Sequence, residues 1–168
     1  MRRRGRVHQL PKDVVGGGRA EEHVTIAAPI SHVWPMFLDI ERWHEYSKIY
    51  DFARWVTGTP WALGATFHAR MNWPVQITVT HVVMAVQPER EIRWLVHAIG
   101  IVIERWIRFV DRGDETEIVS SAIYFGMSTQ KIPGEVSDLL PQFTERYYRD
   151  FKAACEREYL AAQGHKSA

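Results

Sequence analysis

The chain has 168 residues, of which 46% are hydrophobic and 12% aromatic, and its formal net charge is +1. This length predicts one globular domain with a substantial core. The small net charge excludes a general attraction to nucleic acid or to anionic membranes. Cys155 is the only cysteine, so an intramolecular disulfide is excluded and a cytoplasmic location is expected. No apolar run reaches the length of a transmembrane helix, so we expect no stable membrane insertion.

The first 20 residues form a basic leader. Arg2, Arg3, Arg4 and Arg6 precede a run of three glycines at 16–18. This composition predicts a flexible segment over 1–20, although the arginines could also contact phosphate or a membrane surface. A single domain is then expected over 21–162, followed by a short tail over 163–168.

A strand that runs into an amphipathic helix opens the domain. Residues 23–27 alternate as in a strand, and apolar residues then recur at helical spacing from Ile30 to Leu38. Ser31 is a candidate N-cap for this helix, and Asp39 is one for a short second helix. Residues 49–56 return to strand character.

The rest of the chain predicts strands joined by turns, and then a long helix. Further strands are expected over 65–71, 75–86, 92–98, 101–110 and 117–125. An apolar stripe from Val136 to Ala154 predicts the helix, but Pro141 should break its interior, so the continuous part is expected from 141 or 142 to 162. The predicted fold class is α+β. A seven-stranded curved antiparallel sheet would wrap around the long C-terminal helix, with two short helices between strands 1 and 2.

Landmarks in a fixed order carry a family resemblance. They are Ala28-Pro29, Val33-Trp34, Asp39 with Glu41, Trp43 with Tyr46, Pro88, Glu91-Ile92-Arg93-Trp94, Gly100, Thr116 and Gly126. Over about residues 21–162 they resemble the helix-grip (SRPBCC, START-like) superfamily, nearest its polyketide cyclase/dehydrase branch. The resemblance implies a hydrophobic ligand between sheet and helix, with Trp43 and Tyr50 as pocket aromatics. One departure is an apolar residue near Val83, where that branch carries an arginine.

Strand pairing predicts which residues face the long helix. A two-residue loop at 99–100 sets Trp94 opposite Arg105, and a four-residue loop at 112–115 sets Arg105 opposite Ala122. Because Arg105 is the only charge on this face, we expect the face to point inward. The predicted ligand-binding residues are Trp43, Tyr50, Phe67, Val79, Trp94, Ile103, Ile107, Ser120, Phe143 and Tyr147. The facing of His68 and Arg70 depends on the turn at 72–74 and stays open.

Three polar residues of this face are candidate catalytic groups. Arg105 is costly to bury alone, so either a ligand carboxylate, phenolate or enolate pairs with it or its guanidinium reaches water at an open end. His81 could act as an acid or base, although a lone histidine on an apolar strand is more often a hydrogen-bonded wall residue. Tyr124 could hold a ligand oxygen or be an ordinary core aromatic. No HExxH, CxxC or glycine-rich phosphate loop is present, so no metal and no cofactor are expected.

The predicted function is binding of a hydrophobic small molecule, either aromatic, polyketide-like or a lipid, with catalysis of cyclisation and dehydration left open. One alternative is a non-catalytic lipid or quinone carrier, similar to the coenzyme-Q-binding and lipid-transfer members. Another is a co-chaperone-like interaction module, whose surface would also suit a homodimer. That surface would be Leu95, Trp106, Ile123 and Phe125 on the outer face of the sheet. Arg93 beside Trp106 predicts an intramolecular cation–π pair rather than a nucleic-acid contact.

Overall fold

The computed structural model describes residues 8–9, 18–73, 76–98, 101–126 and 134–166. The strands are β1 (His8–Gln9), β2 (Gly18–Ile26), β3 (Tyr50–Thr57), β4 (Thr66–Met71), β5 (Ile77–Gln87), β6 (Glu91–Ala98), β7 (Ile101–Asp111) and β8 (Thr116–Gly126). The helices are α1 (Ile30–Leu38), the 3-10 turn η1 (Ile40–Arg42), α2 (Trp43–Tyr46) and α3 (Gly134–Lys166).

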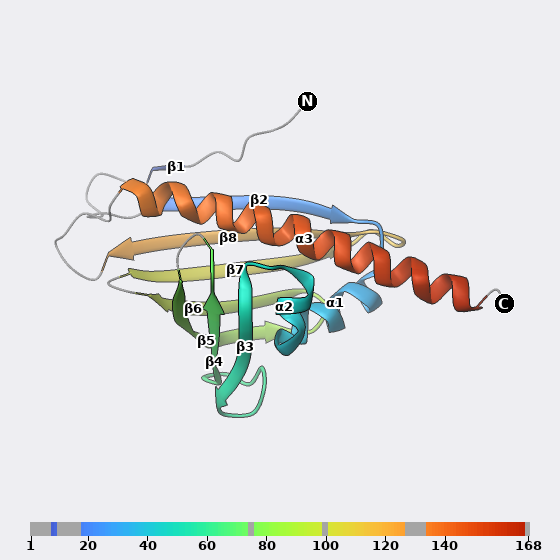
Figure 1. The fold of residues 1–168 in the computed structure, drawn as a ribbon, viewed down its shortest axis with the longest axis horizontal. Coiled ribbons are helices and arrows are strands. Elements are labelled where there is room, and N and C mark those ends of the chain that lie inside the picture. Colours follow the sequence, from blue (N-terminus) through green and yellow to red (C-terminus); the bar gives the residue numbers. More distant parts are fainter. Residues whose placement is uncertain (1–7, 10–17, 74–75, 99–100, 127–133, 167–168) are drawn as a thin grey trace.

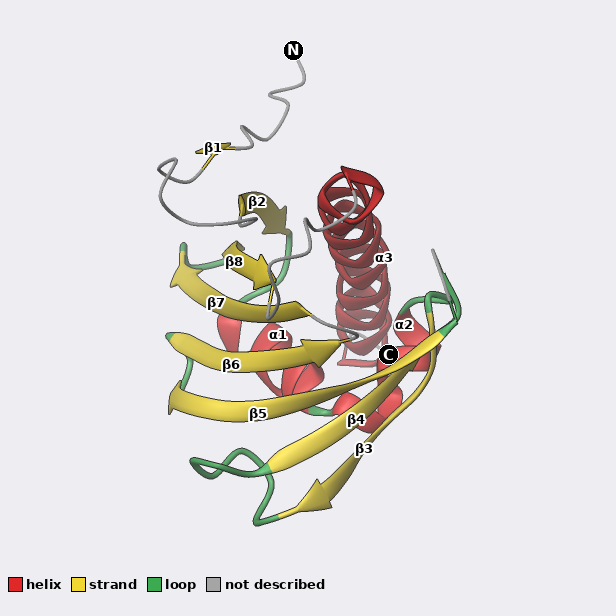
Figure 2. Cartoon of the chain, turned by 90° about the vertical axis from the view of Figure 1, so that its left-hand side faces the viewer, coloured by secondary structure: helices red, strands yellow, loops and turns green. Residues whose placement is uncertain are grey.

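The strands form one antiparallel sheet of order β1-β2-β8-β7-β6-β5-β4-β3. Strands β2 to β8 are the predicted seven, and the two-residue β1 extends the edge beyond β2. The sheet curves, and α3 lies along its concave side next to β2 (Figure 1, Figure 2). The α+β helix-grip architecture predicted from the sequence is therefore confirmed.

The predicted strand register is also confirmed. Trp94 pairs with Arg105, and Arg105 pairs with Ala122. Phe67 pairs with His81 and is fully buried, so the alternating His68 and Arg70 lie on the outer face. This answers the question that the turn at 72–74 left open. We call the helix-facing side of the sheet the inner face.

The helix ends differ from the sequence-based expectations. Helix α1 has Pro29, not Ser31, at its N-cap, and no side chain caps it. Asp39 does precede η1, but its carboxylate makes no capping hydrogen bond. Helix α3 runs through Pro141, so the predicted start at 141 or 142 was wrong. A proline removes one backbone hydrogen bond, and burial of the apolar stripe of α3 offsets that loss.

The beginning of the domain also differs from the expectation. Strand β2 starts at Gly18, five residues before the predicted strand at 23–27. Most of the predicted leader, residues 1–7 and 10–17, lies outside the described residues. In the described part of the chain, no helix is long and apolar enough to cross a membrane.

One end of the inner face is closed by α1 and α2 (Figure 1). We define this closed end by Phe37, Ile92, Phe109 and Ile118, whose exposed fractions are 0–5%. The Phe37 and Phe109 rings meet edge to face at 5.2 Å. Polar contacts then fix α2 to α3, because Ser47 Oγ donates to Asp150 Oδ2 at 2.7 Å. Apolar packing and this tie make the closed end the main core of the molecule.

Candidate functional site

Arg105 lies at the centre of the inner face on β7 and is 7% exposed. Its Nη1 donates to Ser120 Oγ on β8 at 3.0 Å, and its Nη2 donates to Thr144 Oγ1 on α3 at 3.1 Å. The Thr144 hydroxyl in turn donates to the Leu140 carbonyl oxygen at 2.9 Å. The guanidinium therefore ties the sheet to α3 through two neutral hydroxyl groups.

No ion pair neutralises Arg105 among the described residues. Glu22 is a half-buried inner-face carboxylate, opposite Ser120 in the β2–β8 pair. Burial raises the pKa of Glu22, and the neighbouring charges that act on it are Glu145 and His23 rather than Arg105. Arg105 thus carries an unpaired positive charge in this part of the interior.

His81 lies on the inner face of β5 and is 5% exposed. Its ring stacks on Phe67 at 4.2 Å and meets Trp94 edge to face at 5.6 Å. Burial, together with the charge of Arg105, lowers the pKa of His81 to about 3. The imidazole is therefore neutral at physiological pH, and its Nδ1 atom has no hydrogen-bond partner among the described residues.

Four more buried polar atoms have no partner in the described part of the chain: Trp94 Nε1, Tyr147 Oη, Tyr46 Oη and Arg93 Nε. Trp94, on the inner face, and Tyr147, on α3, are 4% and 5% exposed. Burial raises the pKa of Tyr147 well above its ordinary value, so its hydroxyl is protonated and can donate. Buried polar atoms normally have a protein or water partner. The inner face thus offers several hydrogen-bonding groups that the described side chains do not use.

Tyr50 and Tyr124 lie at the sides of this region. The Tyr50 ring meets Phe143 and Tyr147 edge to face at 5.9 and 5.6 Å. Burial raises the pKa of Tyr50, an effect that the charge of Arg105 opposes. Tyr124 leans over Gly18, because a Cβ atom added at Gly18 would lie 2.2 Å from Tyr124 Oη. A glycine at this place in β2 is what gives the Tyr124 ring its room.

The inner face ends in a partly exposed apolar edge on the side opposite α1. We call it the open rim and define it by Met71, Ile77, Ala98, Ile103 and Phe143, all partly buried and packed against the core. These residues come from β4, β5, β6, β7 and α3, so five elements contribute one side chain each. The open rim is the edge of the inner face from which solvent can reach apolar side chains.

The predicted ligand-binding residues fall into three groups: fully buried residues, residues of the open rim, and residues between the two. Trp43, Phe67 and Ile107 are at most 1% exposed, and Trp43 Nε1 donates to the Phe37 carbonyl oxygen at 3.0 Å. Ile103 and Phe143 lie on the open rim. Between these two groups lie Tyr50, Val79, Trp94, Ser120 and Tyr147, which are buried on the inner face or on α3.

Three residues near Arg105 were missed by the sequence analysis. Tyr148, which is 2% exposed, hydrogen-bonds with Ser120 and Arg105, and both contacts oppose the rise in its pKa that burial causes. Leu140, Thr144 and Tyr148 follow one another at i, i+4 and i+8 on one side of the helix, and Phe151 lies on the same side three residues after Tyr148. Glu22 alternates with Val24 and Ile26 in β2. In each case the periodicity of the element was sufficient to place the residue inside.

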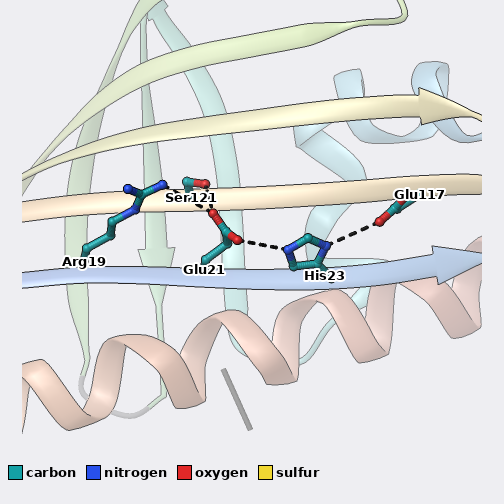
Figure 3. Close-up of polar contacts among 5 residues, drawn as sticks. All are labelled: Arg19, Glu21, His23, Glu117 and Ser121. Carbon is teal, nitrogen blue, oxygen red and sulfur yellow. Dashed lines mark hydrogen bonds and ion pairs between the residues drawn. The ribbon is translucent and has the colours of Figure 1, made fainter. Parts of the chain in front are cut away.

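The outer face of the sheet is polar where β2 and β8 pair. His23 lies between two carboxylates, with Nε2 3.0 Å from Glu21 Oε1 and Nδ1 3.4 Å from Glu117 Oε1 (Figure 3). Glu21 also accepts a hydrogen bond from Ser121 and forms an ion pair with Arg19. Ser121 is buried, whereas Arg19, Glu21, His23 and Glu117 are at least partly exposed, and all of them lie on the outer face.

The predicted cation–π pair on the outer face is confirmed. The Arg93 guanidinium lies 4.6 Å from the Trp106 ring centroid, and Arg93 Nη2 donates to Glu104 Oε1 at 2.7 Å. Trp106 is 37% exposed, while Leu95 and Ile123 are half-buried. The side chain of Phe125 lies outside the described residues. Among the residues described, no group of His, Cys, Asp and Glu could hold a metal ion.

The fold has known relatives among solved structures. Ara h 8.0201 superposes with a TM-score of 0.70 at 12% identity, over 83% of this chain and 98% of that chain. A START superfamily protein from Mycobacterium smegmatis gives a TM-score of 0.67 at 13% identity, over 83% and 97%. The Zhui aromatase/cyclase from Streptomyces sp. R1128 gives 0.67 at 15% identity, over 85% and 93%. At these identities the likeness shows the fold alone.

The sequence comparison goes further than the fold. No curated protein sequence matches the chain. However, residues 18–159 match the family described as polyketide cyclase / dehydrase and lipid transport. This match spans β2 to most of α3 and so includes the whole inner face. The chain therefore belongs to the polyketide cyclase/dehydrase and lipid transport family.

Proposed function

We propose that the protein binds a hydrophobic small molecule, either aromatic, polyketide-like or a lipid, between the inner face and α3. The observation that carries the proposal is a set of unpartnered polar atoms between the sheet and α3, in largely apolar surroundings. Trp94 Nε1, His81 Nδ1 and Tyr147 Oη are all buried and all without a partner among the described residues. An apolar surface with a few convergent polar groups is the usual form of a small-molecule site.

The energetics of burial support this proposal. A buried polar atom without a partner costs about 1–3 kcal/mol, so three of them are a substantial penalty for the folded chain. A ligand that hydrogen-bonds with these atoms would recover part of that free energy. The open rim supplies the access route, because its apolar side chains are only partly buried.

The test compares substitutions on two neighbouring residues of β7. Ile103 faces inward at the open rim, and Val102 faces outward. We expect Ile103→Trp to fill the access route and lower the affinity for Nile red, a neutral apolar dye, by about tenfold or more. Val102→Trp should leave the affinity unchanged. Equal effects of the two substitutions, in proteins with the same circular dichroism, would contradict the proposed site.

The natural ligand can be sought directly. Native mass spectrometry of the purified protein, followed by denaturing extraction, should detect a hydrophobic molecule that co-purifies with the wild type. The Ile103→Trp variant should carry less of it than the Val102→Trp variant. An empty wild-type protein that also fails to bind Nile red would overturn the proposal.

A second candidate function is cyclisation with loss of water, and Arg105 is the observation that favours it. A buried guanidinium can stabilise the enolate oxygen that forms when a proton leaves the carbon next to a carbonyl group. His81 is a poor general acid for this reaction, because with a pKa of about 3 it is neutral at physiological pH. The measurement is the rate at which a linear poly-β-ketone thioester becomes an aromatic product. Faster conversion with wild type than with Arg105→Met would support catalysis; equal rates would support binding alone.

A further inference from the structure

We infer that the ligand is an amphipathic organic acid whose carboxylate binds at Arg105 while its apolar body extends towards the open rim. This inference rests on the proposed function and names the chemical class of its ligand. Arg105 is 93% buried, since its exposed fraction is 7%, and it lies on the inner face. Its hydrogen-bond partners, Ser120, Thr144 and Tyr148, are all hydroxyl groups.

Arg105 carries a charge that burial cannot remove. A guanidinium keeps its proton in proteins, so burial cannot make it neutral as burial makes a histidine neutral. Hydroxyl groups solvate a cation but do not cancel its charge, and a buried charge without a counterion is costly. The described surroundings supply no counterion. A ligand anion could therefore form the ion pair with Arg105 that no described residue forms.

The neighbouring ionisable groups do not supply negative charge either. Burial raises the pKa of Tyr50 and of Tyr148, so both phenols are protonated at physiological pH. His81 is neutral for the reason given above. Glu22 is the carboxylate of the inner face of β2, and it makes no ion pair with Arg105. No described carboxylate therefore pairs with the Arg105 guanidinium, which is left without a direct counterion in this part of the interior.

The remaining hydrogen-bond donors suit a carboxylate. A guanidinium has five N–H groups in a planar fork, and hydrogen bonds with Ser120, Thr144 and Tyr148 use three of them. Trp94, directly opposite Arg105 in the β6–β7 pair, adds an unpartnered N–H, and such paired residues have Cβ atoms about 4.5–5.5 Å apart. A carboxylate accepts up to about four hydrogen bonds, so it can use donors from both residues.

The body of the ligand is expected to be apolar and to contain an aromatic ring. From Arg105, the inner face continues to Ile103 on the same strand and to Phe143 on α3, both on the open rim. The rings of Tyr50 and Phe143, 5.9 Å apart, offer an edge-to-face environment for an aromatic body. The acid would thus enter with its charged end first and leave its apolar end at the rim.

Two probes of the same shape test the inference on the unmodified protein. We expect 2-naphthoate to bind the wild type at least about tenfold more tightly than 2-naphthamide in isothermal titration calorimetry. The two molecules differ only in that a charged carboxylate replaces a neutral amide. Equal affinity, or tighter binding of the amide, would overturn the inference, and it would also mean that the charge of Arg105 is already neutralised within the chain.

Matched variants identify the residue responsible. Arg105→Met should abolish the preference for naphthoate while 2-naphthamide still binds. Arg105→Lys, which keeps the charge but not the planar fork, should restore part of the preference. Arg93→Met on the outer face is the control and should keep the wild-type ratio. An Arg105→Met protein that retains the preference contradicts the assignment to Arg105.

The outcomes separate this inference from the proposed function. If the wild type binds Nile red and both naphthalene probes without preference, the hydrophobic site stands and the acid inference fails. If the wild type binds none of the three, both fail. Preference for naphthoate in the wild type, lost in Arg105→Met and kept in Arg93→Met, supports both.

Discussion

The two ends of the inner face are built for different tasks. At the closed end, Phe37 of α1 and the strand residues Ile92, Phe109 and Ile118 are 0–5% exposed and belong to one core cluster. At the open rim, apolar side chains of similar size, such as Ile103 and Phe143, are only partly buried. The same sheet thus holds a core at one end and an accessible apolar surface at the other.

Because of this difference, the stability of the fold and its affinity for a ligand can be varied separately. Burial of apolar area stabilises the fold in proportion to the area removed from water. The closed end has already removed nearly all of its area, whereas the open rim can remove more when a ligand arrives. We therefore expect substitutions at the closed end to change mainly the free energy of unfolding, and those at the open rim to change mainly ligand affinity.

The largest expected effect comes from a pair of phenylalanines. Phe37→Ala at the closed end should lower the free energy of unfolding by about 3–5 kcal/mol, because it leaves a cavity among tightly packed rings. Phe143→Ala at the open rim should lower it by only about 1–2 kcal/mol, because that ring is already partly exposed. Urea denaturation of both variants checks the difference. Similar losses would remove the distinction between the two ends.

A smaller effect is expected where β2 passes beneath Tyr124. Gly18→Ala places a methyl group 2.2 Å from Tyr124 Oη and 2.3 Å from its Cζ, so the ring must turn away. We expect a loss of about 1–3 kcal/mol in the free energy of unfolding, as for other overpacked sites. Adding Gly18→Ala to a Tyr124→Ala variant should cost much less, because the obstructing ring is gone. A full penalty in the double variant would refute this explanation.

Arg105→Met should have little effect on the stability of the ligand-free protein. Removing a buried charge that lacks a counterion relieves a desolvation penalty, and methionine fills most of the space. The free energy of unfolding should stay within about 1 kcal/mol of the wild type, in either direction. The measurement is urea denaturation without ligand. A loss of several kcal/mol would indicate that Arg105 is a structural residue of the core, and not part of an open binding region.

The smallest expected effect lies on the outer face, around His23. Its hydrogen bond to Glu21 raises the pKa of His23, and Glu117 adds to the rise. The resulting stabilisation is therefore fully present below the ordinary pKa of 6.5 and is lost as the pH rises through the higher folded value. The melting temperature of the wild type should fall slightly between about pH 6 and about pH 8.5.

The carboxylates of this cluster make stability depend on pH in the opposite direction from His23. Hydrogen bonds from His23 and Ser121 lower the pKa of Glu21, and Arg112 lowers that of Glu117. Their stabilisation is present above the ordinary pKa of 4.5 and is lost as the pH falls through the lower folded values.

His23→Gln should flatten the fall in melting temperature between about pH 6 and about pH 8.5, whereas His97→Gln, a control at another exposed histidine, should not. An unchanged slope in His23→Gln would exclude His23 as its source.

Most of the fold could be predicted because its signals are local and repeated. Alternation within strands and the two short loops at 99–100 and 112–115 were enough for the register of β6, β7 and β8. Helix α3 was cut short in the prediction because Pro141 is a strong local signal. The burial that carries the helix through Pro141 is a tertiary effect, and a single sequence does not display it.

The candidate site was predictable only in part. Arg105, Trp94 and Ser120 were found because pairing of adjacent strands puts them on one face. The helical periodicity of α3 places Thr144 and Tyr148 on its buried side. Their contacts with Arg105 could not be predicted, because they depend on how α3 is rotated relative to the sheet, and neither sequence pattern gives that rotation. The neutral state of His81 likewise depends on the combined burial by Phe67 and Trp94, which lie on two other strands.

The pairing of β2 with β8 has a consequence for synthesis on the ribosome. Glu21 and Ser121 touch across this pair, although 100 residues separate them in the chain. Strand β2 emerges early and must wait for β8, and α3 arrives later still. Until then, the nascent chain exposes an unpaired strand edge at β7 and the apolar inner face, both of which favour aggregation. The period between the synthesis of β7 and the docking of α3 is therefore when this protein most needs a chaperone.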